Sequence, residues 1–401
     1  MPQQYTSGHR RRRFLQGLVA TAGAAALPAI TSTEARARST TEPVAFHGRH
    51  QAGVVTPQQP AGLFAAFDVR ATGRAELERL LRTLTGRARA LTTAGAEDSG
   101  GMLGPNPAAD HLTVTVGVGA SLFDHRYGLA SHKPLGLTPM RAFPHDRLDP
   151  ARCHGDLSLQ LCADHHDTVL AALRDITRHL GDQITARWSI DGFLNPPRPT
   201  GVQRNLMGFK DGIENPDPAS TAEMDRFVWV DGDGHEPGWA VGGTYQVLRI
   251  IRMNLEPWDR MTRAEQEHGF GRRHDTGAPL SGGGERETPD YTGDPHGRVT
   301  PLDSHARLAN PRTPETDHQR ILRRGYNYDR ALDHTATHDL GVAFCCYQKD
   351  IQQQYEPIQT RLDGERLATL LTPIGGGYFY TLPGLRDTDD WYASRLMAAP
   401  H

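Results

Sequence analysis

Two stretches, HLTVTVGVG at 111–119 and DLSLQLCADHHDTVLAALRDITRHLG at 156–181, decide the fold of this chain. In the first, apolar residues alternate with small or polar ones, which is the period of a β-strand. The second begins with the same alternation and then changes to the spacing of one helical face. The two stretches therefore predict the order strand, strand, helix. The apolar positions are Leu112, Val114, Val116, Val118, Leu157, Leu159, Leu161, Val169, Leu173, Ile176 and Leu180.

The flanking residues complete a six-element unit. Residues 62–69, GLFAAFDV, predict a strand, and residues 73–91 place leucines on one face of a helix. Residues 185–194, TARWSIDGFL, predict the last strand. The order β-α-β-β-α-β is the ferredoxin-like unit.

A second unit of the same kind follows. Its strands are expected at 242–255, 320–328, 340–348 and 375–384, and its helices at 256–270 and 351–362. We therefore expect an α+β fold with two ferredoxin-like domains of antiparallel sheet, at 60–200 and 201–401. A long loop at 272–319, rich in Gly, Pro, Asp, Arg and His, interrupts the second unit, and a loop of this length is usually functional or disordered.

The first forty residues have the features of an export signal. Four arginines at 10–13 precede an apolar run at 17–30, and Ala35-Arg36-Ala37 fits a cleavage site. Arg11-Arg12-Arg13-Phe14-Leu15 matches the twin-arginine signature, which predicts export in the folded state to the periplasm or the outside of the cell. The run is too short for a permanent membrane helix, so no integral membrane segment is expected in the mature chain.

Charge and cysteine content exclude two further classes. A net charge of −3 argues against nucleic acid as a partner. Four cysteines are too few for a disulfide scaffold of this length. Cys345 and Cys346 are adjacent on an expected strand, so their side chains should point to opposite faces and be buried. A Cys153–Cys162 bridge is the alternative left open.

Chemically informative residues are concentrated in three segments of the second unit. The turn GFKDGIENPDP at 208–218 carries Asp211 between glycines and apolar residues, although Asp211 could also serve only as a turn cap. The segment DSHARLANPR at 303–312 contains His305. In RILRRGYNY at 320–328, either Arg323 or Arg324 must point inward if the strand is buried, and a buried arginine needs an anion.

Several segments in one order make the chain similar to the dye-decolourising peroxidases, and within this family to an exported branch related to the iron-uptake-operon haem peroxidases. The segments are GFKDGIENP, GRRHDTGAPL, DSHARLANPRT, ILRRGYNYD, FCCYQKD and PIGGGYFYTLPG. The resemblance runs from about Gly62 to the C-terminus and implies the duplicated ferredoxin-like fold, with one haem b in the second half.

The resemblance also implies roles for single residues. His305 would be the proximal iron ligand, Asp211 the distal carboxylate and Arg323 the distal arginine. Haem contacts are implied for Gly212, Ile213, Glu214, Arg272, Asn310, Pro311, Arg312 and Arg323, with the arginines near the propionates. Asp350 is a candidate for the partner of His305, although it could equally be the N-cap of the helix that follows.

These roles imply a peroxidase that oxidises aromatic dyes or other donors, including metal ions, with hydrogen peroxide through a ferryl intermediate. Asp211 would relay the peroxide proton, and Arg323 would stabilise the charge that develops on the departing oxygen. Free aspartate has a pKa near 3.9, so we expect dye oxidation to be fastest in acid. Electrons from bulky donors could pass through aromatic residues, although each of these fits core packing better. They are Tyr326, Tyr328, Tyr347 and Trp239.

Two other functions remain open. A haem-handling protein in iron acquisition would release iron from haem or oxidise ferrous iron. A non-catalytic metal-binding module would use some of the twenty histidines.

Overall fold

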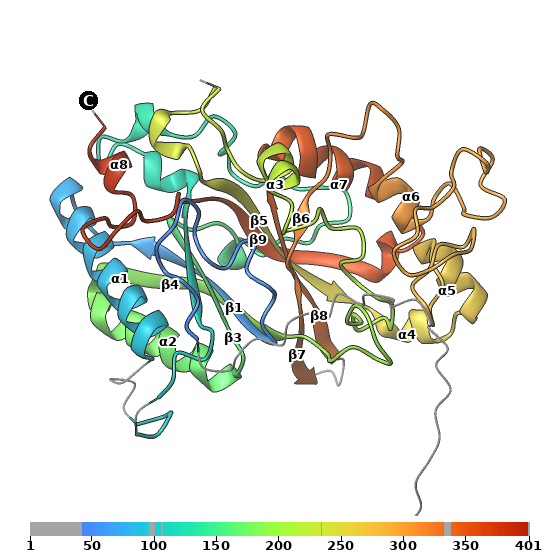
Figure 1. The fold of residues 1–401 in the computed structure, drawn as a ribbon, viewed down its shortest axis with the longest axis horizontal. Coiled ribbons are helices and arrows are strands. Elements are labelled where there is room, and N and C mark those ends of the chain that lie inside the picture. Colours follow the sequence, from blue (N-terminus) through green and yellow to red (C-terminus); the bar gives the residue numbers. More distant parts are fainter. Residues whose placement is uncertain (1–41, 96–100, 106, 234, 333–337, 400–401) are drawn as a thin grey trace, which may run out of the picture. The chain divides into compact units, whose positions relative to one another are not determined.

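The computed structural model describes residues 42–95, 101–105, 107–233, 235–332 and 338–399 (Figure 1). The expected signal segment at 1–40 lies outside these residues. Among the helices of the described residues, none is long enough and apolar enough to cross a membrane.

The first half has the expected six elements. They are β1 (Ala61–Val69), α1 (Arg74–Ala94), β2 (Thr113–Gly119), β3 (Leu157–Ala163), α2 (His166–Leu180) and β4 (Ile184–Phe193). The strands lie in the order β4-β1-β3-β2, and all of these pairs are antiparallel. This is the strand order of a ferredoxin-like unit.

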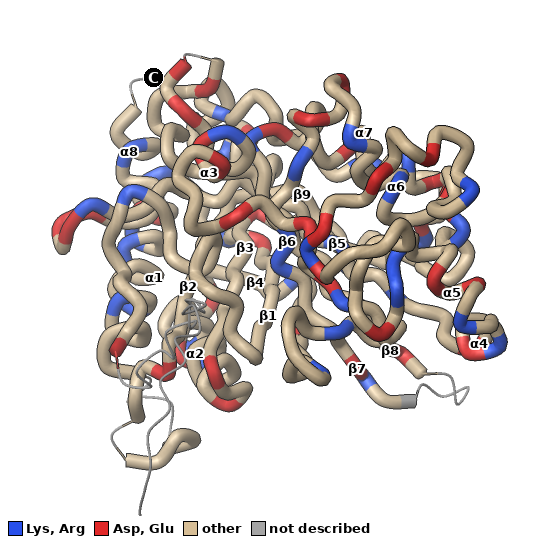
Figure 2. Tube along the Cα trace, turned by 45° about the vertical axis from the view of Figure 1, so that its right-hand side comes forward, with Lys and Arg blue, Asp and Glu red and all other residues tan. Residues whose placement is uncertain are grey.

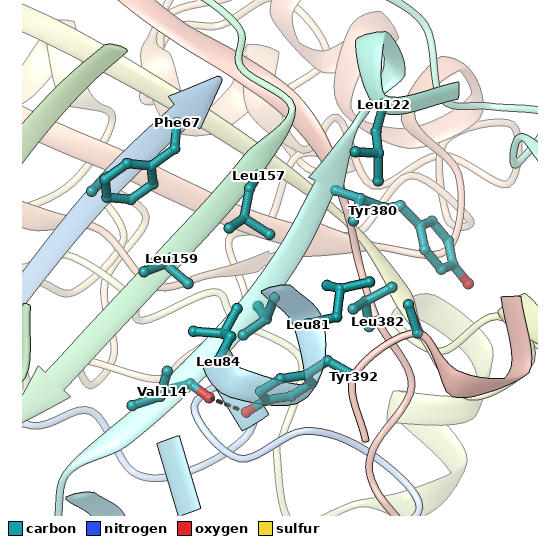
Figure 3. Close-up of a cluster of buried hydrophobic side chains, with 14 of the residues drawn as sticks. Phe67, Leu81, Leu84, Val114, Leu122, Leu157, Leu159, Tyr380, Leu382 and Tyr392 are labelled. Carbon is teal, nitrogen blue, oxygen red and sulfur yellow. Dashed lines mark hydrogen bonds between the residues drawn. The ribbon is translucent and has the colours of Figure 1, made fainter. Parts of the chain in front are cut away.

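Helices α1 and α2 cover one face of this sheet (Figure 1) because their apolar stripes match its apolar positions. Leu81 and Leu84 of α1 pack in the same cluster as Val114 and Leu159 of the strands (Figure 3). Tyr392, near the C-terminus, closes this core and donates a 3.2 Å hydrogen bond to the carbonyl of Val114. This core is shared with the second half, since the same cluster also contains Tyr245, Tyr380 and Leu396.

The second half repeats the strand order. Its strands are β5 (Thr244–Met253), β6 (Leu322–Arg323), β7 (Tyr326–Leu332), β8 (His338–Gln348) and β9 (Leu371–Thr381). Antiparallel pairing gives β9-β5-β8, and β8 also pairs with β7 and with the two-residue β6. Its helices are α3 (Thr221–Phe227), α4 (Leu255–Asp259), α5 (Arg263–Phe270), α6 (His305–Ala309), α7 (Glu356–Leu362) and α8 (Ser394–Met397).

The two halves join at both sheet edges. β2 pairs with β9 and β4 pairs with β7, so within the described residues eight of the nine strands form a closed ring and β6 pairs only with β8. The expected α+β fold with duplicated ferredoxin-like units and antiparallel strands is confirmed.

Ring closure buries both faces of β2 and β3, whereas β4 keeps exposed residues at alternate positions. Every residue of β2 and β3 is buried, including the small and polar residues that alternate with the apolar ones. The polar residues face the ring interior, where Tyr347 donates to Gln160 Oε1 at 2.6 Å and Gln246 donates to the Tyr347 hydroxyl at 3.0 Å. The interior thus contains a hydrogen-bonded polar network beside an apolar cluster to which Tyr347 itself belongs.

Three expected elements differ in detail. The single helix expected at 256–270 is two helices, because α4 ends at Asp259 and Thr262 begins α5 with a capping box to Glu265. The strand expected at 320–328 is divided at 324–325 into β6 and β7. The helix expected at 351–362 begins with a π-helical turn, Ile351–Tyr355, before α7.

All four cysteines are free and buried, so the Cys153–Cys162 bridge is not formed. Cys345 and Cys346 belong to different apolar clusters, on opposite faces of β8, as their adjacency predicted.

Candidate active site

The turn that carries Asp211 is shaped by its glycines. Gly208 and Gly212 have φ angles of +85° and +99°, a region that favours glycine. Phe209 is buried between them and stacks on Phe270 with ring centroids 4.0 Å apart. The backbone N–H of Asp211 is held by the Gln203 carbonyl at 3.0 Å. The turn is therefore anchored on its apolar side, and the Asp211 carboxylate is left to face a cavity.

Arg323 meets this carboxylate from β6. Its Nη1 donates to Asp211 Oδ1 at 2.8 Å, and both side chains are partly exposed. In Figure 2 acidic and basic residues adjoin next to β6. The preference for Arg323 over Arg324 at the cavity therefore agrees with the geometry.

Arg324, directly after β6, is the buried arginine of the pair. Among the described residues its hydrogen-bond acceptors are the Thr56 carbonyl and Gln59 Oε1, both neutral. The expectation that the buried guanidinium would need an anion is wrong here. Two neutral oxygens accept from its Nη groups, and its Nε has no hydrogen-bond partner among the described residues.

His305 opens the short helix α6 and lines the same cavity as Asp211 and Arg323. Its Nδ1 lies 2.6 Å from Glu365 Oε2. The candidate Asp350 is wrong as the partner of His305. Asp350 is the N-cap of the following π-helical turn and accepts a 2.8 Å hydrogen bond from the Gln353 N–H.

Glu365 sets the protonation of His305. Burial alone would lower the pKa of the imidazole, but the Glu365 carboxylate outweighs burial and holds the pKa of His305 above its usual value. In the neutral imidazole the carboxylate favours the tautomer with the proton on Nδ1, which leaves the lone pair on Nε2.

The cavity between these residues encloses about 1770 Å³ of atom-free space, its solvent-open mouth included. Among the residues that were expected to bind the cofactor, those that line it are Asp211, Gly212, Ile213, Glu214, Arg272, His305, Asn310 and Arg323. Its apolar wall includes Met207, Ile251, Phe270, Val342, Phe344, Ile358, Leu362 and Leu371.

Pro311 and Arg312 are outside this lining, but Arg312 still reaches it through Glu214. The Glu214 carboxylate accepts hydrogen bonds from both Arg272 and Arg312. Two guanidinium groups share one carboxylate, so this rim of the cavity carries a net positive charge suited to an anionic group. Burial lowers the pKa of Arg272, and Glu214 partly offsets this effect.

A second, smaller cavity adjoins the first at Asp211, Gly212 and Arg323. Its lining is mostly polar and includes Gln58, Gln203, Arg204, Asn205, Asn215 and Asn327. The Asp211–Arg323 pair therefore stands between an apolar chamber and a polar one.

The aromatic residues considered for electron transfer lie in the protein core. Tyr326, Tyr328, Tyr347 and Trp239 are all buried, so none of them is a surface exit for electrons. In the described part of the chain, no group of three or more His, Cys, Asp or Glu residues is arranged to hold a metal ion.

The residues fit a haem. The mostly apolar chamber is lined by His305, whose Nδ1 is held by Glu365, and by the Asp211–Arg323 pair. Arg272 and Arg312, joined through Glu214, add positive charge at its rim. Haem iron in peroxidases is held by one histidine, and a carboxylate and an arginine that line the same chamber are groups that peroxide chemistry can use.

The chain belongs to the Dyp-type peroxidase family. Residues 51–194 match its N-terminal family profile and residues 202–386 its C-terminal one. The expectations of a haem peroxidase with haem b are confirmed at this level.

The chain is 45% identical to the deferrochelatases of Shigella sonnei (strain Ss046) and Escherichia coli (strain K12), over 96% of each chain. Among solved structures it resembles a DyP-type peroxidase from Cellulomonas bogoriensis, with a TM-score of 0.82 and 38% identity over 90% of this chain and 99% of that one. Ferric DtpA from Streptomyces lividans has a TM-score of 0.80 and 34% identity over 90% and 98%.

Two contacting residues were missed from the sequence. Glu365 follows α7, sixty positions from His305, and no local pattern links the two. Asn215 lies in the quoted turn segment, and its hydrogen bonds to Arg323 become visible only when β6 is in place.

Proposed function

We propose that this chain reduces hydrogen peroxide at a haem ligated by His305 and oxidises aromatic dyes or phenol-like donors, with Asp211 and Arg323 as the distal catalytic residues. The observation that carries the proposal is the Asp211–Arg323 pair, joined at 2.8 Å, lining the same chamber as His305. The haem would supply the iron at which the O–O bond breaks and which then withdraws electrons from donors.

Asp211 is suited to move the peroxide proton. Its Oδ1 is engaged by Arg323, which leaves Oδ2 to accept a proton from one peroxide oxygen and to return it to the other. Arg323 is permanently charged and a planar donor, so it would stabilise the negative charge on the departing oxygen.

The other contacts fit the cofactor. Gly212 and Ile213 would lie along the macrocycle, and Asn310, Pro311 and the Glu214-linked arginines Arg272 and Arg312 would lie near its edge, with the cations toward the propionates. The polar second cavity would give a small hydrophilic oxidant a route to Asp211 that suits aromatic donors poorly.

Export by the twin-arginine route is part of the proposal. It rests on Arg11-Arg12-Arg13-Phe14-Leu15 and the apolar run that follows. A fusion of residues 1–41 to a reporter should reach the periplasm of a bacterial host, and changing Arg11 and Arg12 to Lys should keep it in the cytoplasm. Export that survives the double change would overturn this part.

The test is the visible spectrum of the purified protein before and after one equivalent of hydrogen peroxide. We expect a haem band that shifts with peroxide, and His305→Ala should lose the band or change it to that of an unligated haem. His268→Ala, in the exposed part of neighbouring α5, is the matched control and should behave as the unmodified protein does. An unchanged band in His305→Ala would overturn the ligand assignment.

Release of iron from haem is the second candidate, because relatives that are 45% identical over nearly the whole chain are named deferrochelatases. Product analysis separates the two functions. Oxidised donor with intact haem supports the peroxidase, whereas free porphyrin and released iron support the second candidate.

A further inference from the structure

We propose that Asn215 is the positioning residue for Arg323, and that its side-chain amide acts as a one-residue substitute for a missing strand at the edge of β6. The inference rests on the proposed function of Asp211 and Arg323 and adds a residue to which no role has been given. Asn215 would act through Arg323 and not on peroxide directly.

The amide group binds the backbone of Arg323 at both of its polar atoms. Asn215 Nδ2 donates to the Arg323 carbonyl at 2.7 Å, and the Arg323 N–H donates to Asn215 Oδ1 at 3.1 Å. A neighbouring strand would make the same two bonds with its own N–H and C=O. Leucine, alanine or serine at this position could not supply both.

The edge of the sheet needs such a partner here. β6 has only two residues and pairs with β8 on one side, through Leu322 with Tyr347 and Arg323 with Cys346. The N–H of Arg324 points to β8 and donates to the Cys345 carbonyl at 2.7 Å. The polar backbone atoms of Arg323 therefore point the other way, and without Asn215 they would face the polar cavity.

The Asp211–Arg323 ion pair does not fix this geometry alone. The two side chains are 40% and 27% exposed, and ion pairs at such exposure contribute little to holding a conformation. A backbone tether at Arg323 restricts the guanidinium much more, because it fixes the Cα from which the side chain starts.

The tether also couples the two catalytic groups. Asn215 lies on the turn that carries Asp211, and its own N–H donates to the Gly212 carbonyl at 3.3 Å. One turn therefore presents the carboxylate and grips the backbone of the arginine. The separation between Asp211 and Arg323 is set by this turn and not by the flexible side chains.

The test is a double-mutant cycle in the haem-loaded protein. The variants are Asn215→Ala, Arg323→Leu and both together, with Asn195→Ala as the matched control, since its amide donates instead to the Arg204 carbonyl at 3.3 Å. Asn215→Asp keeps the shape and the acceptor but places an oxygen against the Arg323 carbonyl. The readouts are the equilibrium affinity of the ferric protein for fluoride, the rate of its reaction with hydrogen peroxide, and thermal unfolding.

We expect Asn215→Ala and Asn215→Asp to slow the peroxide reaction about 10- to 100-fold. Their fluoride affinity should fall several-fold, with haem content retained, and Asn195→Ala should match the unmodified protein. In the Arg323→Leu background Asn215→Ala should add no further loss. Asn215→Ala could also change the peroxide rate simply by widening the polar cavity through which peroxide enters. The fluoride measurement excludes this explanation, because an equilibrium affinity does not depend on the route of entry.

The outcomes separate the two proposals. If Arg323→Leu changes neither fluoride affinity nor peroxide rate, the proposed role of Arg323 fails. If Arg323→Leu has its effect but Asn215→Ala has none, or the two losses are independent in the double variant, the tether is overturned.

Discussion

Glu365 Oε2 lies 2.6 Å from His305 Nδ1, and both side chains line the large cavity. The carboxylate side chain is only 5% exposed, so water screens its charge poorly. A buried negative charge on the second nitrogen makes the imidazole a stronger electron donor through Nε2. The pair is therefore expected to control the iron as well as to orient its ligand.

Glu365→Gln should weaken the effect of residue 365 on the iron without removing the hydrogen bond to His305. The amide oxygen can still accept from Nδ1, but the negative charge is lost. We expect a higher iron reduction potential and a peroxide reaction slower by about 10- to 100-fold. Spectroelectrochemistry and stopped-flow absorbance measure these two quantities.

Glu356→Gln is the control for that variant. Glu356 is a similarly enclosed carboxylate on α7, but it pairs with Arg141 and accepts from Tyr378, away from His305. Its substitution should leave the potential where it was. Equal potentials in Glu365→Gln and the unmodified protein would contradict the role given to Glu365.

Arg361 should be needed to hold the helix that carries His305. α6 has five residues and is too short to be stable alone. Arg361 donates to the carbonyls of Leu308 at 2.8 Å and Ala309 at 3.4 Å, near the end of this helix. We expect Arg361→Ala to cost about 1–3 kcal/mol in the free energy of unfolding, because partly buried carbonyls lose their donors.

Arg361→Ala should also release haem faster, as measured by transfer to an excess of apomyoglobin. Arg366→Ala is the comparison, since Arg366 binds Asp303 just before α6 in a pair that is about half exposed. An exposed pair of this kind contributes about 0–1 kcal/mol. If Arg361→Ala and Arg366→Ala lower the free energy of unfolding and speed haem release to the same extent, the bonds from Arg361 to the carbonyls of α6 are not what holds this helix.

The sequence predicted those features that repeat locally. Alternation and helical spacing placed β1 to β4, α1 and α2 within a few residues, and the order of elements then predicted the ferredoxin-like units. The ring could not be predicted in this way, because β2 and β9 are separated by about 250 residues and their pairing depends on two completed sheets. The buried position of polar residues such as Gln160 on β3 follows from this closure and could not be predicted locally.

The site residues also divide into those that local sequence could indicate and those that only the fold brings together. Asp211 and His305 lie in recognisable segments. Because side chains alternate along a strand, the inward-pointing arginine had to be either Arg323 or Arg324. The partner of His305 could not be found from order in the chain. Asp350 follows a strand of the same half, but its side chain caps its own helical turn, whereas Glu365 reaches His305 from the end of α7.

The free energy of unfolding should depend on pH through Asp390 in the C-terminal segment. This buried carboxylate accepts hydrogen bonds from the N–H groups of Arg386 and Trp391 and from the Ser394 hydroxyl. Burial would raise the pKa of Asp390, but the bonds from Ser394 and Arg386 outweigh it and hold the pKa below its usual value. The charged form of Asp390 therefore stabilises the fold.

The sign of the effect follows from the lowered pKa. The stabilisation is complete above the ordinary aspartate pKa of about 3.9 and is lost as the pH falls through the lower value in the folded protein. Asp390→Asn should weaken the hydrogen bonds that hold this segment in place, next to Tyr392 of the first core. We expect the substitution to lower the free energy of unfolding by about 1–2 kcal/mol at pH 7. Urea unfolding at pH 7, 5 and 3 should show the two proteins converging only at the acid end. A difference that is constant across this range would mean that packing, and not the charge of Asp390, is responsible.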